Sequence, residues 1–96
     1  MTTPQQITEA LRRAKPFLKE KFHVAEIGLF GSYARLEQSQ ESDVDILVKF
    51  DKAIGWEFVD CRGYLEEILN KQVDLVTVNG LKDQFREQIL SEVIYA

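Results

Sequence analysis

The sequence is poor in several features that would point to a secreted or membrane protein. Its 96 residues include only one cysteine and two prolines. None of its apolar runs approaches the ~20 residues that a membrane-spanning helix needs. The lone Cys61 cannot form an intramolecular disulfide, and the first residues lack the charged and apolar segments of a secretion signal. We therefore expect a cytoplasmic protein that does not interact with a membrane.

Positive charge is also scarce in this chain. It has 12 Lys and Arg residues against 16 Asp and Glu residues, which gives a net charge of −4. Proteins that bind long nucleic acids usually present a basic face to the phosphate backbone, so long nucleic acid is a poor candidate partner. A basic protein partner would fit an acidic surface better.

The chain shows no internal repeats, no low-complexity tracts and no linker-like stretches. Its composition, 45% hydrophobic and 29% charged, is that of an ordinary globular domain. Because so short a chain leaves no room for a second core, we expect one domain over residues 1–96.

Hydrophobic spacing predicts helices that alternate with strands. Apolar residues recur at helical spacing after Thr3-Pro4, and Pro16 should either kink this first helix or split it in two. Strands are predicted over residues 25–30, 43–50 and 73–78. Further helices are predicted over residues 33–37, 58–69 and 81–93. The order predicts an α+β fold, a small sheet of three or so strands with helices packed mainly on one face.

The second predicted strand carries two carboxylates on the same face. Asp43 and Asp45 are two residues apart, and strand side chains repeat every second residue. Neighbouring unpaired carboxylates repel each other and lose hydration, and a divalent cation removes both costs. Asp74 of the third strand would join them if the two strands are neighbours, although it could instead pair with Lys49 or Lys71. Three carboxylates suit Mg²⁺, which prefers oxygen ligands.

A Gly-Ser pair lies upstream of these carboxylates. Gly31 permits a tight turn and a close approach of the backbone to a phosphate. Ser32 would then begin a helix, where free N–H groups favour an anion, although serine is also favoured there as a simple cap. Arg35, one turn further on, could bind a triphosphate oxygen or could be a solvated charge. Metal ligands beside a phosphate seat indicate transfer of a phosphorus group from a nucleotide.

The spacing of these residues resembles that of a known superfamily. Gly-Ser, ten residues and then Asp-x-Asp is the defining motif of nucleotidyltransferases related to DNA polymerase β, and residues 31–45 match it without a gap. The segments GSYAR, DILVKF, VDLVT and LKDQFREQILSEVIYA resemble the minimal nucleotidyltransferases (MNT) of prokaryotes. The resemblance covers residues 25–96.

This resemblance implies a short mixed sheet with flanking helices, and an antitoxin that is encoded beside a HEPN-family ribonuclease toxin. The implied reaction moves AMP from ATP to a tyrosine of that toxin. Asp43 and Asp45 would hold two Mg²⁺ ions, and Asp74 would bind one of them and help to deprotonate the acceptor hydroxyl. The nucleotide would be bound by the upstream residues Gly31, Ser32 and Arg35.

Two other functions stay open at this point. The protein could neutralise its partner by stoichiometric binding, with the chemistry secondary. It could also transfer a nucleotide to a small molecule such as an aminoglycoside. Enzymes of that second type carry extra substrate-binding segments, for which 96 residues leave little room.

Overall fold

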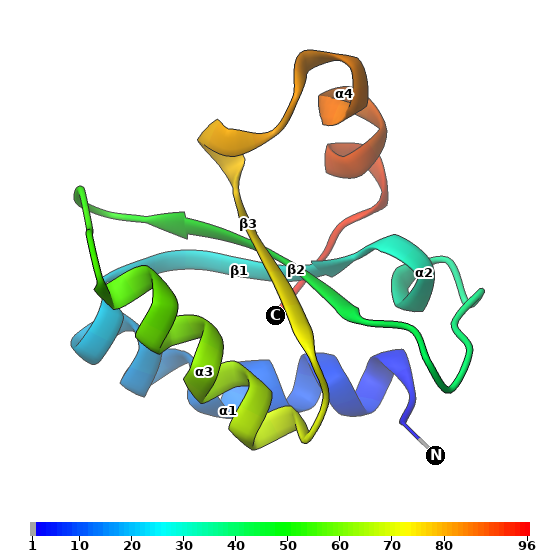
Figure 1. Ribbon diagram of the computed structural model, residues 1–96, viewed down its shortest axis with the longest axis horizontal. Helices are drawn as coiled ribbons and strands as arrows, with labels where there is room; N and C mark the ends of the chain where they lie inside the picture. Colours follow the sequence, from blue (N-terminus) through cyan, green and yellow to red (C-terminus); the bar gives the residue numbers. More distant parts are fainter. Residues whose placement is uncertain (1) are drawn as a thin grey trace.

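The computed structural model describes residues 2–96, and Figure 1 shows how its helices and strands are arranged. In chain order the elements are α1 (Pro4–Phe22), β1 (Val24–Phe30), α2 (Gly31–Ala34), β2 (Val44–Phe50), α3 (Glu57–Leu69), β3 (Val73–Thr77), the 3₁₀ turn η1 (Val78–Gly80), α4 (Asp83–Glu92) and β4 (Ile94–Tyr95). The predicted α+β fold is confirmed.

The four strands form one mixed sheet in the order β3-β2-β1-β4. β1 is antiparallel to both of its neighbours, whereas β2 and β3 are parallel and are connected through α3. The sequence predicts three or so strands, and β4 is the strand that it misses. Ile94 and Tyr95 follow the apolar stripe of α4 directly, and they become a strand only by pairing with Leu29 and Gly28 of β1.

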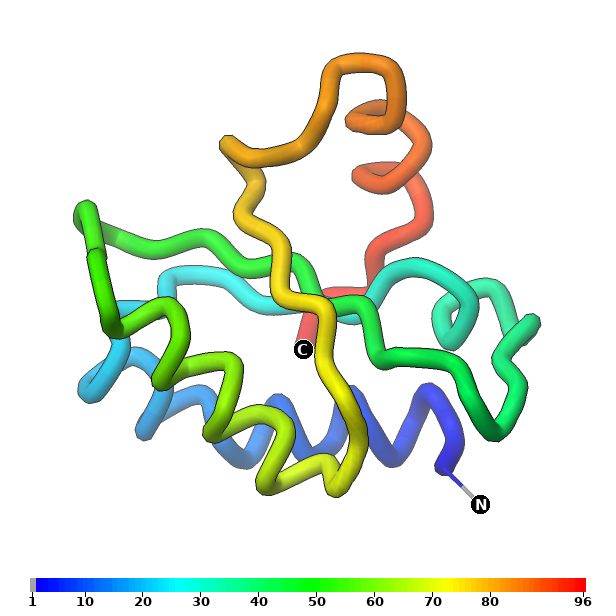
Figure 2. Tube along the Cα trace, in the orientation of Figure 1, coloured from blue at the N-terminus to red at the C-terminus, as the bar shows by residue number. Residues whose placement is uncertain are grey.

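The main core lies between the sheet and the α1–α3 layer. Both views of the chain show α1 and α3 side by side below the sheet (Figures 1 and 2). Cys61 and Leu65 of α3 are buried there. The stripe predicted for the first helix is buried in full, and its members are Ile7, Leu11, Ala14, Leu18 and Phe22. Packing mainly on one face is therefore confirmed.

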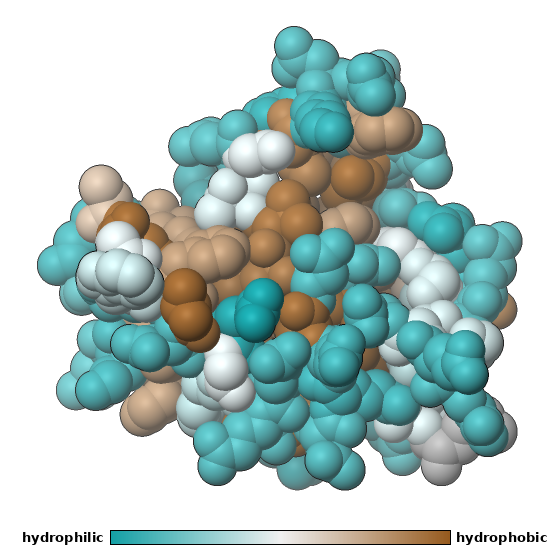
Figure 3. All heavy atoms as spheres, viewed as in Figure 1, coloured by the Kyte–Doolittle hydropathy of each residue, from teal (hydrophilic) through white to brown (hydrophobic). Residues whose placement is uncertain are grey.

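The opposite side of the sheet is covered less completely, by α4. A smaller buried cluster lies there, made of Phe30, Leu47 and Leu81. Figure 3 shows apolar side chains gathered between α4 and α3, with hydrophilic side chains around them. Within residues 2–96, no helix combines the length and the apolar character that crossing a membrane would require.

Pro16 lies within α1 without dividing it. The helix runs unbroken through this position, so the alternative that Pro16 splits it is wrong. Pro16 is on the exposed side, where water can bond to the carbonyl that a proline leaves unpaired. The start of the helix is held by a capping box, in which Gln6 N donates to Thr3 Oγ1 and Thr3 N donates to Gln6 Oε1. Burial of the opposite face then outweighs one missing hydrogen bond.

Other predicted boundaries shift by a few residues. β2 begins at Val44, so Asp43 lies just before the strand that was predicted to include it. α2 is a single turn that starts at Gly31 and ends at Ala34, so it begins and ends earlier than the predicted helix over 33–37. β3 ends at Thr77 because the Thr77 hydroxyl accepts a hydrogen bond from Gly80 N, which begins η1.

Leu36 provides a test of backbone strain next to α2. Its φ is +59° and its side chain is 72% exposed. A left-handed backbone conformation destabilises an L-residue by about 1 kcal/mol. The exposed Leu36 side chain buries little apolar surface that could offset this cost. We predict that Leu36→Gly raises the free energy of unfolding by about 0.5–1 kcal/mol, and hence Tm by a few degrees, in thermal denaturation. Leu36→Ala keeps the same restriction on φ and should match the wild type. Equal Tm values for the two variants would contradict this reading.

Candidate active site

The register of the sheet brings two of the predicted carboxylates together. β2 and β3 are parallel neighbours, and Asp45 lies directly opposite Asp74. Both residues are near the beginning of their strands. Side chains that face each other across adjacent strands are about 5 Å apart at Cβ, so these two carboxylates are in direct electrostatic contact. The condition set by the sequence, that the second and third strands be neighbours, is met.

Asp43 lies immediately before β2, exposed to solvent. Together with Asp74 it lines a hollow of about 540 Å³, whose other walls include Arg62 and Lys71. Within residues 2–96, no three His, Cys, Asp or Glu side chains are gathered closely enough to enclose a metal ion. The geometry is therefore a close pair, Asp45 and Asp74, with a third carboxylate nearby, and not a closed cage.

The ion pair suggested as an alternative for Asp74 does not form. Lys49 lies 3.9 Å from the Glu26 carboxylate instead. In the part of the chain that the structure describes, no ion pair joins Asp74 to Lys71 either. The negative charge beside Asp45 is thus not neutralised by a lysine.

Electrostatics mark Asp45 as the centre of this group. Burial raises the pKa of Asp45 from 3.8 to about 6, and repulsion from Asp74 and then Asp43 adds to the shift. Arg35 opposes it from the other side. The ionised form of Asp45 is therefore destabilised, and a cation at this position would stabilise it. The candidate ligand atoms are the carboxylate oxygens of Asp43, Asp45 and Asp74. Such oxygen donors fit a hard divalent cation such as Mg²⁺.

Gly31 brings the Gly-Ser turn against the Asp45 carboxylate. β1 pairs with β2 so that Phe30 is opposite Asp45, and the next residue begins α2. Gly31 has a φ of +76°, and a Cβ atom at this position would come within 2.8 Å of Asp45 Cγ. No residue with a side chain fits both constraints. Ser32, half-buried, follows in the first turn of α2.

Arg35 lies on the far side of the same turn. It lines a hollow of about 250 Å³ together with Gly31 and Asp45. Its Nε donates to Glu37 Oε1 at 2.8 Å, and its Nη1 donates to the Glu92 carboxylate at 3.1 and 3.2 Å. Hydrogen bonds to Glu37 and then Glu92 raise the pKa of Arg35, so it stays charged. Sequence reasoning misses Glu92, because no local spacing connects it to Arg35.

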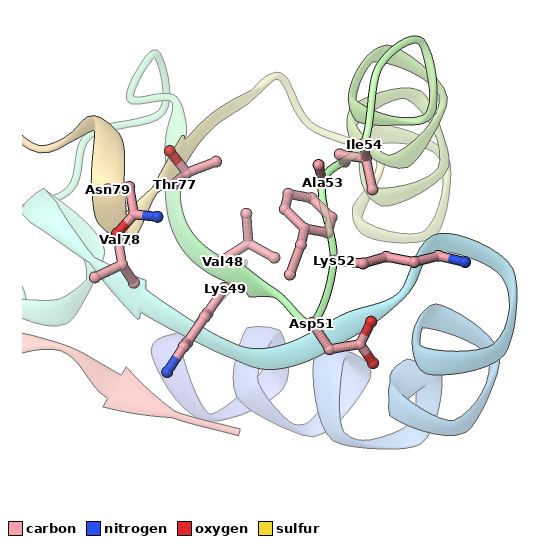
Figure 4. A pocket seen from close by; sticks show the side chains of 10 residues that line it. Val48, Lys49, Asp51, Lys52, Ala53, Ile54, Thr77, Val78 and Asn79 are labelled. Atoms are coloured by element: carbon pink, nitrogen blue, oxygen red, sulfur yellow. The ribbon is translucent and has the colours of Figure 1, made fainter.

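Another hollow, of about 450 Å³, lies at the opposite ends of β2 and β3 (Figure 4). Its walls include Lys49, Lys52, Thr77 and Asn79. None of the predicted site residues lines it. The carboxylates and the Gly-Ser turn therefore form their site at the beginning of β2 and β3 and not here.

A Gly-Ser turn held against strand carboxylates is the arrangement that defines nucleotidyltransferases, and the fold and site together place this protein in that class. The chain belongs to the family described as the nucleotidyltransferase domain, whose model matches residues 11–96. The superfamily resemblance inferred from the motifs is confirmed.

Individual relatives agree with this membership. The chain is 43% identical over 96 residues to protein adenylyltransferase MntA of Thermococcus cleftensis, covering 99% of this chain and 97% of that protein. A solved structure classed as a minimal nucleotidyltransferase is 32% identical, covers 97% of this chain and 95% of its own, and superposes with a TM-score of 0.80. The MNT antitoxin complex of Shewanella oneidensis shares the fold at 20% identity and a TM-score of 0.66, covering 93% of this chain and 70% of that one.

The raised pKa of Asp45 predicts how stability depends on pH. The folded state binds the Asp45 proton more tightly than the unfolded state does. Protonated Asp45 therefore contributes to the free energy of unfolding below pH 3.8, and this contribution is lost as the pH rises through about 6. We predict that Asp45→Asn, at about pH 7.5 in EDTA, raises Tm by roughly 4–8 °C, the effect of ~1 kcal/mol in a domain of this size. The gain should shrink at about pH 4.5, where folded wild-type Asp45 is mostly protonated.

Asp51→Asn is the matched control, because Asp51 is an exposed carboxylate directly after β2. The difference in Tm between about pH 7.5 and about pH 4.5 should be the same for Asp51→Asn as for the wild type. A wild-type Tm equal to or above that of Asp45→Asn at the higher pH would show that Asp45 is not under electrostatic strain.

Proposed function

We propose that this nucleotidyltransferase moves AMP from ATP to a tyrosine of a HEPN-family toxin and so neutralises it, in a reaction that requires Mg²⁺. The observation that carries the proposal is the contact of the Gly31 turn with Asp45, whose neighbour across the sheet is Asp74. A turn without a side chain would admit phosphate oxygens close to its backbone, and the adjacent carboxylates would hold the divalent metal.

The relatives support a protein as the acceptor. The Thermococcus cleftensis protein is named a protein adenylyltransferase, and this chain covers 97% of it. That relative therefore has little extra length for a small-molecule binding segment, which favours the protein acceptor over an aminoglycoside-like one. The Shewanella oneidensis complex joins an MNT antitoxin to a tri-AMPylated HEPN toxin, which supports the class of partner.

The chemistry follows from where the side chains lie. Asp43, Asp45 and Asp74 would hold one or two Mg²⁺ ions, which when bound would neutralise charge on the phosphates and make the attacking hydroxyl more acidic. Gly31 and Ser32 would bind the phosphates through backbone N–H groups and the serine hydroxyl. The triphosphate charge would be balanced further by Arg35.

The transfer itself is one displacement at phosphorus. The tyrosine oxygen forms a bond to the α-phosphorus of ATP while the bond from that phosphorus to the pyrophosphate oxygen breaks. Asp74 lies beside Asp45 and is exposed, so its carboxylate can accept the tyrosine proton. The products are a tyrosine–AMP phosphodiester and pyrophosphate.

Substitution of Asp43 and of Asp45 tests this function. With the toxin encoded beside this protein, ATP and Mg²⁺, the wild type should add the mass of AMP to the toxin in intact mass spectrometry. Asp43→Asn and Asp45→Asn should slow the addition by roughly 100-fold or more, because the ligands of the transition-state charge are lost. Circular dichroism should show an unchanged fold, and Asp51→Asn should remain active.

Two results would overturn parts of this proposal. Normal modification by the Asp variants would remove the carboxylates from the active site. Variants that do not modify the toxin but still protect cells from it would instead establish neutralisation by stoichiometric binding, with the chemistry secondary.

Ligand binding provides a test that needs no partner. A ligand that binds only the folded state raises stability by about 2.7 kcal/mol at 100 times its dissociation constant. At that concentration, Mg²⁺ together with the non-hydrolysable analogue AMP-PNP should therefore raise Tm of the wild type by roughly 10–20 °C. The part of this gain that depends on Mg²⁺ should vanish in Asp45→Asn and persist in Asp51→Asn. An equal dependence on Mg²⁺ in all three proteins would place the metal elsewhere.

A further inference from the structure

Glu92, the last residue of α4, makes the one long-range ion pair near the Gly-Ser turn among residues 2–96. Its two carboxylate oxygens accept from Arg35 Nη1 at 3.1 and 3.2 Å, across 57 positions of sequence. The Glu92 side chain is only 15% exposed. A carboxylate withdrawn from water to this extent requires a charged partner, and Arg35 is that partner.

This contact orients the Arg35 guanidinium without using all of its donors. A guanidinium has five N–H groups in one plane. Arg35 Nε donates a hydrogen bond to Glu37, and Arg35 Nη1 donates to the Glu92 carboxylate. Within residues 2–96, neither hydrogen of Arg35 Nη2 is donated to a hydrogen bond. The side chain also lines the hollow shared with Gly31 and Asp45, so its remaining donors are available where a phosphate would lie.

The position of Glu92 is set by the same strand that ends in the Gly-Ser turn. Two residues after Glu92, β4 begins, and it pairs with β1 through Leu29 and Gly28. Gly28 permits this close approach, because a Cβ atom there would lie 2.7 Å from Val93 Cγ2. β1 therefore fixes the end of α4 on one side and the start of α2 at its own end. The segments that carry Glu92 and Arg35 are thus both placed by β1.

We propose that Glu92 is a positioning residue of the nucleotide site, which holds Arg35 in the orientation that binds the phosphates of ATP. The inference rests on the proposed function, since it requires a nucleotide at the Gly31 turn. It assigns a role in substrate affinity to the end of α4, an element that carries none of the predicted site residues. Glu92 lines the same hollow as Arg35, Gly31 and Asp45, and the role we assign to it is exerted through Arg35.

Glu37 offers an internal comparison on the same guanidinium. It also accepts from Arg35, at 2.8 Å, but its side chain is 64% exposed and only two positions away in sequence. Exposed ion pairs contribute little, because water competes for both partners and salt screens them. Removing the charge of Glu37 should therefore matter much less than removing the charge of Glu92.

A double-mutant cycle on the full chain tests the proposal. The dissociation constant of Mg²⁺ with AMP-PNP is measured by calorimetry for the wild type, Glu92→Gln, Arg35→Ala and the double variant. We expect Glu92→Gln to weaken binding roughly fivefold to tenfold, and Arg35→Ala to weaken it at least as much. The double variant should bind no more weakly than Arg35→Ala alone, because a residue that acts by positioning Arg35 has no effect once Arg35 is removed.

Three further variants separate positioning from a general effect on folding. Glu92→Asp keeps the charge and should recover part of the affinity. Glu37→Gln should change affinity by less than about twofold. Glu87→Gln, at an exposed position of the same helix, should change nothing. If Glu92→Gln lowers Tm, the test is the comparison of Glu92→Asp with the wild type. The shorter carboxylate keeps the ion pair but moves Arg35, so Glu92→Asp should bind AMP-PNP more weakly than the wild type.

Several outcomes would overturn the inference. Tighter binding by Glu92→Gln would mean that Glu92 competes with the phosphates for Arg35. Equal losses on removing Glu92 in the presence and absence of Arg35 would mean that it acts by another route. Unchanged affinity in Arg35→Ala, with transfer still abolished in Asp45→Asn, would refute this inference and leave the proposed function standing. A wild type that neither binds AMP-PNP nor transfers AMP would refute both.

Discussion

The packing of the core keeps two carboxylates, those of Asp45 and Asp74, close together although they repel each other. Parallel pairing of β2 with β3 holds the carboxylates of Asp45 and Asp74 against each other, and partial burial makes the charged state of Asp45 less stable still. The pair cannot separate, because Val44 and Ile46, which flank Asp45, are fully buried beneath the sheet. A slip of one residue would turn those apolar side chains outward. Hydrophobic burial thus supplies the energy that keeps these like charges together.

β1 organises everything around that pair, and it does so through two glycines. Gly31 at its end lets the turn approach the Asp45 carboxylate, and Gly28 in its middle lets β4 lie close on the other side. Gly28 is required by close contact, and Gly31 is required both by close contact and by its positive φ. One strand therefore links the Gly-Ser turn, the acidic neighbours and α4.

The two layers on the sheet are unequal. α1 and α3 bury a continuous core, whereas α4 leaves Phe85 46% exposed and Leu90 37% exposed. The end of α4 is nevertheless well defined, because the β1–β4 pairing and the pair of Glu92 with Arg35 hold it. A thinly packed helix with a fixed end can place one side chain accurately at the site. Its exposed apolar positions are not needed for that task.

The sequence by itself determined the features that depend on local spacing. The apolar stripe of the first helix, the Gly31-Ser32 pair and its distance to Asp43 and Asp45 can all be recognised along the chain, because helix and strand periods are short. The tertiary structure alone decided that Asp74 faces Asp45, that α1 continues through Pro16 and that the last residues form β4. It alone also brought Glu92 to Arg35. These outcomes depend on which strands become neighbours and in what register, and that choice is set by burial summed over the whole core, which no short stretch of sequence contains.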